Sequence, residues 1–282
     1  MKYGLNFFPT AYTMQPGELG KLAEERGFES LWFPEHTHIP VERRSPWPGG
    51  PELPKEYLHV YDPFVALTAA AATTRDLKLA TGVCLIVERD PITTAKTAAT
   101  LDQVSNGRFI FGIGGGWNFE EMENHGTNPK TRFRLLRERV MAMKALWSEE
   151  EEPGFKGAMV NFDPVWSFPK PVQPGGIPVV MGGDGATTFD RVIEFCEGWM
   201  PIARGHNATD LIAAKVPELR AKAQAAGRDP DSISLSLFGC PPTPEGINTI
   251  AKAGFHRAIF GLKTGPRDDV LKQLDELTKA MI

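Results

Sequence analysis

Two neighbouring side chains early in the chain, Glu35 and His36, have the right chemical types to move a proton. They directly follow a short apolar run. A histidine in such a place donates or accepts a proton near neutral pH. The adjacent carboxylate can orient the imidazole or accept a hydrogen bond of its own. The sequence therefore predicts acid–base chemistry centred on His36, with Glu35 as its helper. Alternatively, these are ordinary loop residues whose polar groups form hydrogen bonds with the backbone or with water.

The same segment also contains a possible metal pair, His36 and His38. A metal site in an enzyme of this kind needs further ligands from later strand ends. Of the other histidines, only His206 is expected near such an end, while His256 precedes its strand. We therefore expect no resident metal.

Two glycine-rich segments, residues 112–118 and 181–188, form the strongest local signal. Consecutive glycines leave backbone N–H groups free to approach an anion or a flat ring. The second segment runs into a predicted helix start, where unpaired N–H groups and the helix dipole favour an anion. The glycine spacing is not that of a dinucleotide fingerprint. Together the segments predict a ligand with an extended, phosphate-bearing tail, although a flexible connector is the alternative for the first.

These segments lie between alternating strand and helix patterns. The predicted strands are Tyr3–Phe8, Ser30–Phe33, Leu77–Val83, Arg108–Ile113, Pro178–Met181, Gly198–Ile202, Ser232–Phe238 and Arg257–Phe260. Helices are predicted after Pro16 and over Pro63–Thr74, Pro91–Val104, Thr131–Trp147, Thr187–Cys196, Asp210–Ala226, Glu245–Ala253 and Asp268–Met281. Apolar strands alternating with helices indicate a parallel sheet. Eight such pairs predict one α/β domain over residues 1–282, a (β/α)8 TIM barrel, with a doubly wound open sheet as the alternative.

In a barrel of this kind, the loops at the carboxyl ends of the strands carry function. Two long irregular segments interrupt the alternation, residues 35–60 and residues 149–176, and the second has a possible hairpin. They contain Trp47, Tyr57, Trp166 and Phe168. These aromatic residues predict either a pocket for an apolar or aromatic small-molecule substrate or the interface of a homodimer.

Bulk composition excludes several classes of protein. The chain has 282 residues and a formal net charge of −4, which disfavours nucleic-acid partners. No apolar stretch approaches the roughly 18 residues that span a bilayer, so we expect no membrane partner. Three widely spaced cysteines form a poor disulfide framework and fit a reducing cytoplasm.

Three segments, "LWFPEHTHIP", "ATGVCLIVERDPITTAKTAATLDQVSNGRFIFGIGGGWNFEEMENHG" and "PVVMGGDG", resemble the bacterial luciferase-like superfamily, in particular its deazaflavin-dependent oxidoreductases. The resemblance covers nearly the whole chain and implies a (β/α)8 barrel with an insertion after the fourth helix. That insertion corresponds to residues 149–176. One departure is Glu35, because an aspartate commonly precedes the histidine in that family.

The resemblance implies coenzyme F420 as cofactor and hydride transfer to or from a small organic substrate. It places His36 near the reactive ring carbon and a non-prolyl cis peptide at Gly82–Val83. The cofactor contacts expected on this basis are Phe7, His36, Gly82, Val83, Cys84, Gly114, Gly115, Gly116, Asn118, Met181, Gly182 and Gly183. An FMN-dependent monooxygenase is the alternative, and a barrel that binds such a cofactor without turnover is a third reading.

Overall fold

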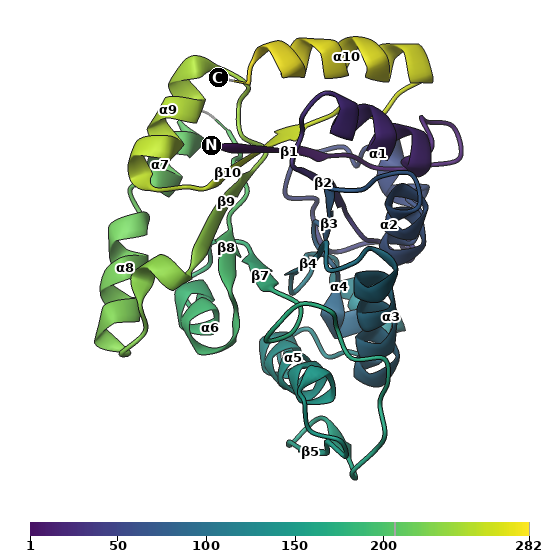
Figure 1. The fold of residues 1–282 in the computed structure, drawn as a ribbon, viewed down its shortest axis with the longest axis vertical. Coiled ribbons are helices and arrows are strands. Elements are labelled where there is room, and N and C mark those ends of the chain that lie inside the picture. The colour runs from purple at the N-terminus through teal and green to yellow at the C-terminus, as the bar shows by residue number, and fades with distance from the viewer. Residues whose placement is uncertain (206, 282) are drawn as a thin grey trace.

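The computed structural model describes residues 1–205 and 207–281, so His206 lies outside the described residues. Within them, eight parallel strands close into a barrel in the order β1-β10-β9-β8-β7-β4-β3-β2 (Figure 1). The strands are β1 (Lys2–Asn6), β2 (Ser30–Phe33), β3 (Lys78–Thr81), β4 (Phe109–Ile113), β7 (Val179–Gly182), β8 (Gly198–Met200), β9 (Ser234–Phe238) and β10 (Arg257–Gly261). The predicted closed barrel is confirmed, and the open sheet is excluded.

Helices surround the barrel, as Figure 1 shows. They are α1 (Pro16–Glu25), α2 (Pro63–Ala71), α3 (Pro91–Val104), α4 (Phe119–Asn124), α5 (Arg132–Trp147), α6 (Thr188–Phe195), α7 (Ala208–Ala213), α8 (Val216–Ala225), α9 (Pro244–Ala253) and α10 (Arg267–Lys279). Short 3-10 helices cover Lys55–Leu58, Ile86–Glu88 and Pro230–Ser232. No helix in the described part of the chain is long and apolar enough to cross a bilayer.

Alternation along β4 explains why its sequence is apolar throughout. Phe109 and Phe111 point outward, where their rings lie 5.8 and 6.3 Å from the ring of Phe64 on α2. Ile110, between them, joins a second buried cluster that includes Trp32. Because both faces of the strand are buried, polar residues have no solvent-facing position along it.

The amino ends of the strands are tied together by an ion pair. Arg257 at the start of β10 donates hydrogen bonds of 2.7 and 2.8 Å to the carboxylate of Glu29, which immediately precedes β2. It also donates to the Ser236 hydroxyl on β9 at 2.9 Å. Burial opposes ionisation of Glu29, but the hydrogen bond and charge of Arg257 lower the pKa of this carboxyl. This end of the barrel is therefore closed by buried polar contacts.

The helices differ from the prediction in two places. The predicted helix over 210–226 is split into α7 and α8, since Pro217 in the first turn of α8 has no N–H to continue an earlier helix. The second error is α4, which was not predicted. By contrast, the hairpin expected in residues 149–176 exists as β5 (Phe155–Lys156) paired with β6 (Asn161–Phe162), and it projects beyond α5 (Figure 1).

Candidate active site at the carboxyl ends of the strands

A cavity of about 500 Å³ lies at the carboxyl ends of the barrel strands. Its wall contains most of the residues that the sequence singled out. The predicted site residues that border it are Glu35, His36, Gly82, Val83, Gly114, Gly115, Gly116, Met181, Gly182 and Gly183. The Gly82–Val83 peptide is cis, as the resemblance implied.

Three predicted cofactor contacts lie elsewhere. Phe7 is fully buried between sheet and helices, because alternation along the chain directs its neighbours Asn6 and Phe8 to the cavity instead. Cys84 is also fully buried in this core, and burial raises the pKa of its thiol. Asn118 caps α4, where its side-chain oxygen accepts a hydrogen bond from the backbone N–H of Glu121.

His36 is held between two side chains that contact opposite nitrogens of its ring. Nδ1 lies 2.6 Å from Oε2 of Glu121, and the indole N–H of Trp117 donates to Nε2 at 3.3 Å. An indole can only donate, so Nε2 must accept. The proton of the neutral imidazole therefore sits on Nδ1 and is donated to Glu121.

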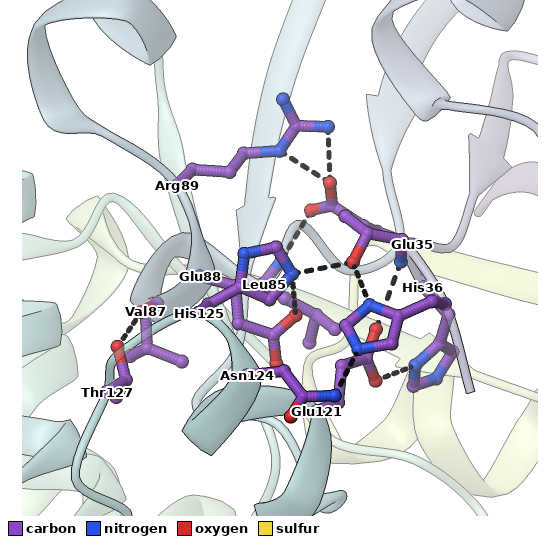
Figure 2. Close-up of polar contacts among 12 residues, drawn as sticks. Glu35, His36, Leu85, Val87, Glu88, Arg89, Glu121, Asn124, His125 and Thr127 are labelled. Atoms are coloured by element: carbon purple, nitrogen blue, oxygen red, sulfur yellow. Dashed lines mark hydrogen bonds and ion pairs between the residues drawn. The ribbon is translucent and has the colours of Figure 1, made fainter. Parts of the chain in front are cut away.

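Glu121, not Glu35, is the carboxylate that orients the imidazole. Its second oxygen accepts the backbone N–H of Thr37 at 3.0 Å, and the residue is fully buried. Glu35 turns the other way, accepting from the backbone N–H of Leu85 at 2.7 Å and from the guanidinium of Arg89 (Figure 2). The expectation that Glu35 positions His36 was wrong, since its charge is already committed to Arg89.

The possible metal pair does not converge. Nε2 of His38 lies 2.9 Å from the side-chain amide nitrogen of Asn124, and its Nδ1 lies 2.9 Å from the Thr37 hydroxyl. His36 is bound instead to Glu121 and Trp117. Among the described residues, no three His, Cys, Asp or Glu side chains are grouped to hold a metal ion.

The second glycine segment presents open backbone to the cavity. Gly183 has a φ of +91°, and a Cβ added there would meet nothing within 4 Å. At Gly115, by contrast, an added Cβ would lie 2.6 Å from the ring of Phe133. The N–H of Gly183 donates to the Met200 carbonyl at 3.3 Å, and its carbonyl accepts from the Trp199 indole at 2.8 Å. Gly183 therefore leaves room for a ligand to approach the backbone, whereas Gly115 allows close packing of the wall itself.

Two arginines that sequence reasoning missed, Arg191 and Arg204, border the same cavity. The guanidinium of Arg191, on α6, lies 3.9 Å from the ring centre of Phe133 and donates to the Thr187 hydroxyl at 2.6 Å. Burial lowers the pKa of Arg191. The signal that could have revealed it is its spacing of four residues from Thr187, which places both on one helix face. Beside Gly183, these cations make a wall suited to an anionic group.

One buried acceptor in the cavity wall has no donor. The side-chain oxygen of Asn6, at the end of β1, makes no hydrogen bond within residues 1–205 and 207–281. Buried polar atoms are rarely left unpaired. A ligand that presents an N–H to Asn6 and an anion to the wall around Gly183 and Arg191 matches both features.

The opening beside His36 is aromatic. The Tyr57 ring lies 5.3 Å from the imidazole of His36, 4.7 Å from Phe8 and 5.6 Å from Trp47. Burial raises the pKa of the Tyr57 hydroxyl. Trp166 and Phe168, predicted with them, are 75% and 54% exposed and do not line the cavity.

Known proteins resemble the chain over most of its length. An uncharacterised protein of Mycobacterium tuberculosis is 40% identical over 98% of this chain and 97% of its own length. A protein of Kineococcus radiotolerans named F420-dependent glucose-6-phosphate dehydrogenase is 31% identical, over 83% of this chain and 66% of its own.

Solved structures share the fold at lower identity. The monooxygenase RslO1 of Streptomyces bottropensis superposes with a TM-score of 0.79 at 21% identity, covering 100% of this chain and 98% of that one. The coenzyme F420-dependent tetrahydromethanopterin reductase of Methanopyrus kandleri has a TM-score of 0.74 at 18% identity, over 99% and 97% of the two chains. The sequence profile of the luciferase-like monooxygenases matches residues 13–276. The chain therefore belongs to the luciferase-like monooxygenase family.

Proposed function

We propose that this protein is a coenzyme F420-dependent oxidoreductase that transfers a hydride between the deazaflavin and a small organic substrate. The observation that carries the proposal is the position of His36, which borders the same cavity as the open glycine wall at Gly183. The F420 dependence of the Kineococcus radiotolerans relative supports the choice of cofactor. When bound, F420 supplies a ring carbon that accepts or releases a hydride.

The protein would hold this cofactor at both of its ends. Gly182, Gly183 and Arg191 would border the phosphodiester, since the space beside Gly183 admits a ligand and the guanidinium of Arg191 favours an anion. Asn6 would accept a hydrogen bond from the ring at the floor of the cavity. Gly82, Val83, Gly114 and the neighbouring glycines would lie against the flat ring.

His36 would exchange the proton that accompanies the hydride. If the substrate is an alcohol, its hydroxyl would replace the indole N–H of Trp117 at Nε2, which then takes the hydroxyl proton while the carbon loses a hydride. The carboxylate of Glu121 stabilises the imidazolium that forms, because it lies 2.6 Å from Nδ1. General acid–base help of this kind contributes roughly 10²–10⁴-fold to rate.

The wall beside His36 favours a substrate with an apolar or aromatic body and one hydroxyl or carbonyl group. Phe8, Trp47 and Tyr57 offer rings to such a body. The carboxylate of Glu35 is neutralised by Arg89, so it adds no free charge at this place.

A fluorescence titration of the purified protein with F420 and, separately, with FMN tests the proposal. We expect saturable binding of F420 and weaker binding of FMN. Tight binding of FMN alone would assign the protein to the flavin monooxygenases instead. Binding of F420 without any turnover of alcohols, aldehydes or ketones would favour a carrier or sensor.

A further inference from the structure

The indole of Trp117 occupies the only nitrogen of His36 that has a lone pair to offer. Its N–H donates to Nε2 at 3.3 Å, while the proton on Nδ1 is donated to Glu121 at 2.6 Å. A neutral imidazole has a single acceptor nitrogen. As long as the indole remains in this position, Nε2 cannot take a proton from another donor.

Protonation of His36 would turn this contact from favourable to unfavourable. An imidazolium carries an N–H on both ring nitrogens, so its Nε2–H would point at the indole N–H, and neither group can accept. The His36 side chain is only 6% exposed, which leaves little room for water to separate the two donors. The observed arrangement therefore suits the neutral imidazole alone, and Trp117 must move before Nε2 gains a proton.

Little else in the structure holds the indole in place. Its nitrogen has one proton to donate, so a turn of the ring breaks no hydrogen bond except the one to His36. The Tyr57 ring contacts it edge-on at 6.4 Å, and the guanidinium of the exposed Arg43 lies 6.0 Å from its centre. The other groups that face His36 are Glu121 and Tyr57, and both stay where they are when the indole turns.

A second cavity of about 500 Å³ adjoins the first. Among residues 1–205 and 207–281, Trp117 alone borders both. Pro46 and Phe119 give the second cavity apolar surface, against which an indole packs well. The displaced ring therefore has a place to go.

We propose that Trp117 is a movable wall between the two cavities and a positioning residue for the proton transfer. Before a substrate enters, the indole holds Nε2 of His36. A substrate hydroxyl then takes the place of the indole N–H, and the ring turns into the second cavity. The catalytic role of this movement rests on the proposed function, whereas the hydrogen bond and its loss on protonation of His36 do not.

The movement gives the proton transfer a defined order. The substrate O–H bond breaks, its proton goes to Nε2, and the carbon–hydrogen electron pair leaves as a hydride to the bound deazaflavin while the C=O bond forms. Glu121 faces the Nδ1–H of the imidazolium that results. The indole returns to Nε2 only after the carbonyl product has left and water has taken the Nε2 proton.

NMR of ¹⁵N-labelled protein without cofactor tests the contact directly. At pH 8 we expect a scalar coupling between the indole nitrogen of Trp117 and Nε2 of His36, transmitted through the N–H···N hydrogen bond. Trp117→Phe identifies the indole signal by removing it, and should move the Nε2 resonance toward that of an imidazole nitrogen without a donor. A folded wild-type protein that lacks the coupling would overturn the proposal.

Trp47→Phe is the matched control. Trp47 borders the same cavity, but its ring contacts Tyr57 at 5.6 Å and makes no hydrogen bond to His36. This variant should keep the coupling.

Acidification of the unchanged protein tests the movement. As His36 becomes protonated, the coupling should disappear, the indole signal of Trp117 should shift over the same pH range, and new proximity signals should join its ring to Phe119 and Pro46. An indole signal that stays constant while His36 is protonated would overturn the movable wall.

The role in turnover is tested with F420 and the alcohol that the enzyme oxidises best. Because the hydroxyl no longer competes with the indole, Trp117→Phe should lower KM roughly two- to tenfold, with kcat nearly unchanged. An unchanged or raised KM would overturn the positioning role. Absence of F420 binding or of alcohol oxidation in wild type, with the coupling and its loss on acidification observed, would refute only the proposed function.

Discussion

His36 and Glu121 lie 85 positions apart in the chain, yet their side chains meet at 2.6 Å. The contact exists because the loop after β2 and the helix α4 after β4 both stand at the carboxyl end of the barrel. Asn118 begins α4 by capping it, and this fixes Glu121 in the first turn, beneath the imidazole. The tautomer of His36, which follows β2, is thus fixed by Glu121 on α4, which follows β4.

Replacement of Glu121 by glutamine should separate hydrogen bonding from charge. The amide can still accept the Nδ1 proton of His36 but cannot stabilise an imidazolium. We expect kcat to fall roughly 10–100-fold, as for other residues that orient a catalytic histidine, with F420 affinity nearly unchanged. Steady-state kinetics together with a fluorescence titration measures both. An unchanged kcat would remove the charge of Glu121 from the chemistry.

His36→Ala should retain the cofactor but turn over slowly. The glycine wall at Gly183 does not depend on the imidazole, so we expect F420 binding to stay within a few-fold of wild type. The rate of hydride transfer should fall by roughly 10²–10⁴-fold. Single-turnover absorbance changes of the bound cofactor report this rate. Normal transfer in this variant would exclude His36 as the proton acceptor.

Gly183→Ala tests the open space beside Gly183 in the cavity wall. At a φ of +91° any side chain is strained by about 1 kcal/mol or more, and a methyl group would also intrude on the ligand. We expect at least a tenfold increase in the Kd for F420. Gly175→Ala is the matched control, with a φ of +80° and no neighbour within 4 Å, outside the cavity. Equal effects of the two substitutions on Kd would show that strain alone is responsible.

Glu88 should make stability depend on pH in a direction opposite to that of most carboxyl groups. Burial, followed by the negative charges of Glu121 and Glu35, raises its pKa in the folded protein from the ordinary value of 4.5 to about 9. The contribution of Glu88 to the free energy of unfolding is complete below pH 4.5. It is lost as the pH rises toward 9, because in this range the Glu88 carboxyl ionises easily only in the unfolded chain.

Urea unfolding at pH 5 and pH 8 should therefore show Glu88→Gln gaining stability over wild type by about 1 kcal/mol per pH unit. A difference between the two proteins that does not change with pH would indicate that Glu88 ionises normally.

The sequence predicted the barrel closely where apolar runs are bounded by strong helix or turn signals. Ser30–Phe33 and Pro91–Val104 were predicted with the bounds observed. Errors arose where a side chain's direction depends on one residue of register. Phe7 was expected at the cofactor, but β1 directs Asn6 to the cavity and Phe7 to the shell of helices.

Contacts between loops could not be predicted. The spacing of Asn118 and Glu121 is a capping signature that could have revealed α4. Nothing in the sequence indicates that Glu121 then reaches His36, or that Arg89 occupies Glu35. Both pairings depend on how far the barrel turns between β2, β3 and β4, which is a property of the closed sheet. The predicted homodimer likewise stays a prediction.

The contact of Arg257 with Glu29 and Ser236 stands at the end of the barrel away from the cavity. It joins β9 and β10 to the start of β2, so the sheet stays closed by residues that no substrate touches. Loops at the opposite end can then be exchanged without reopening the barrel. Selection or engineering can replace the aromatic segment around Trp47 and Tyr57, while the scaffold and the contact of His36 with Glu121 are kept.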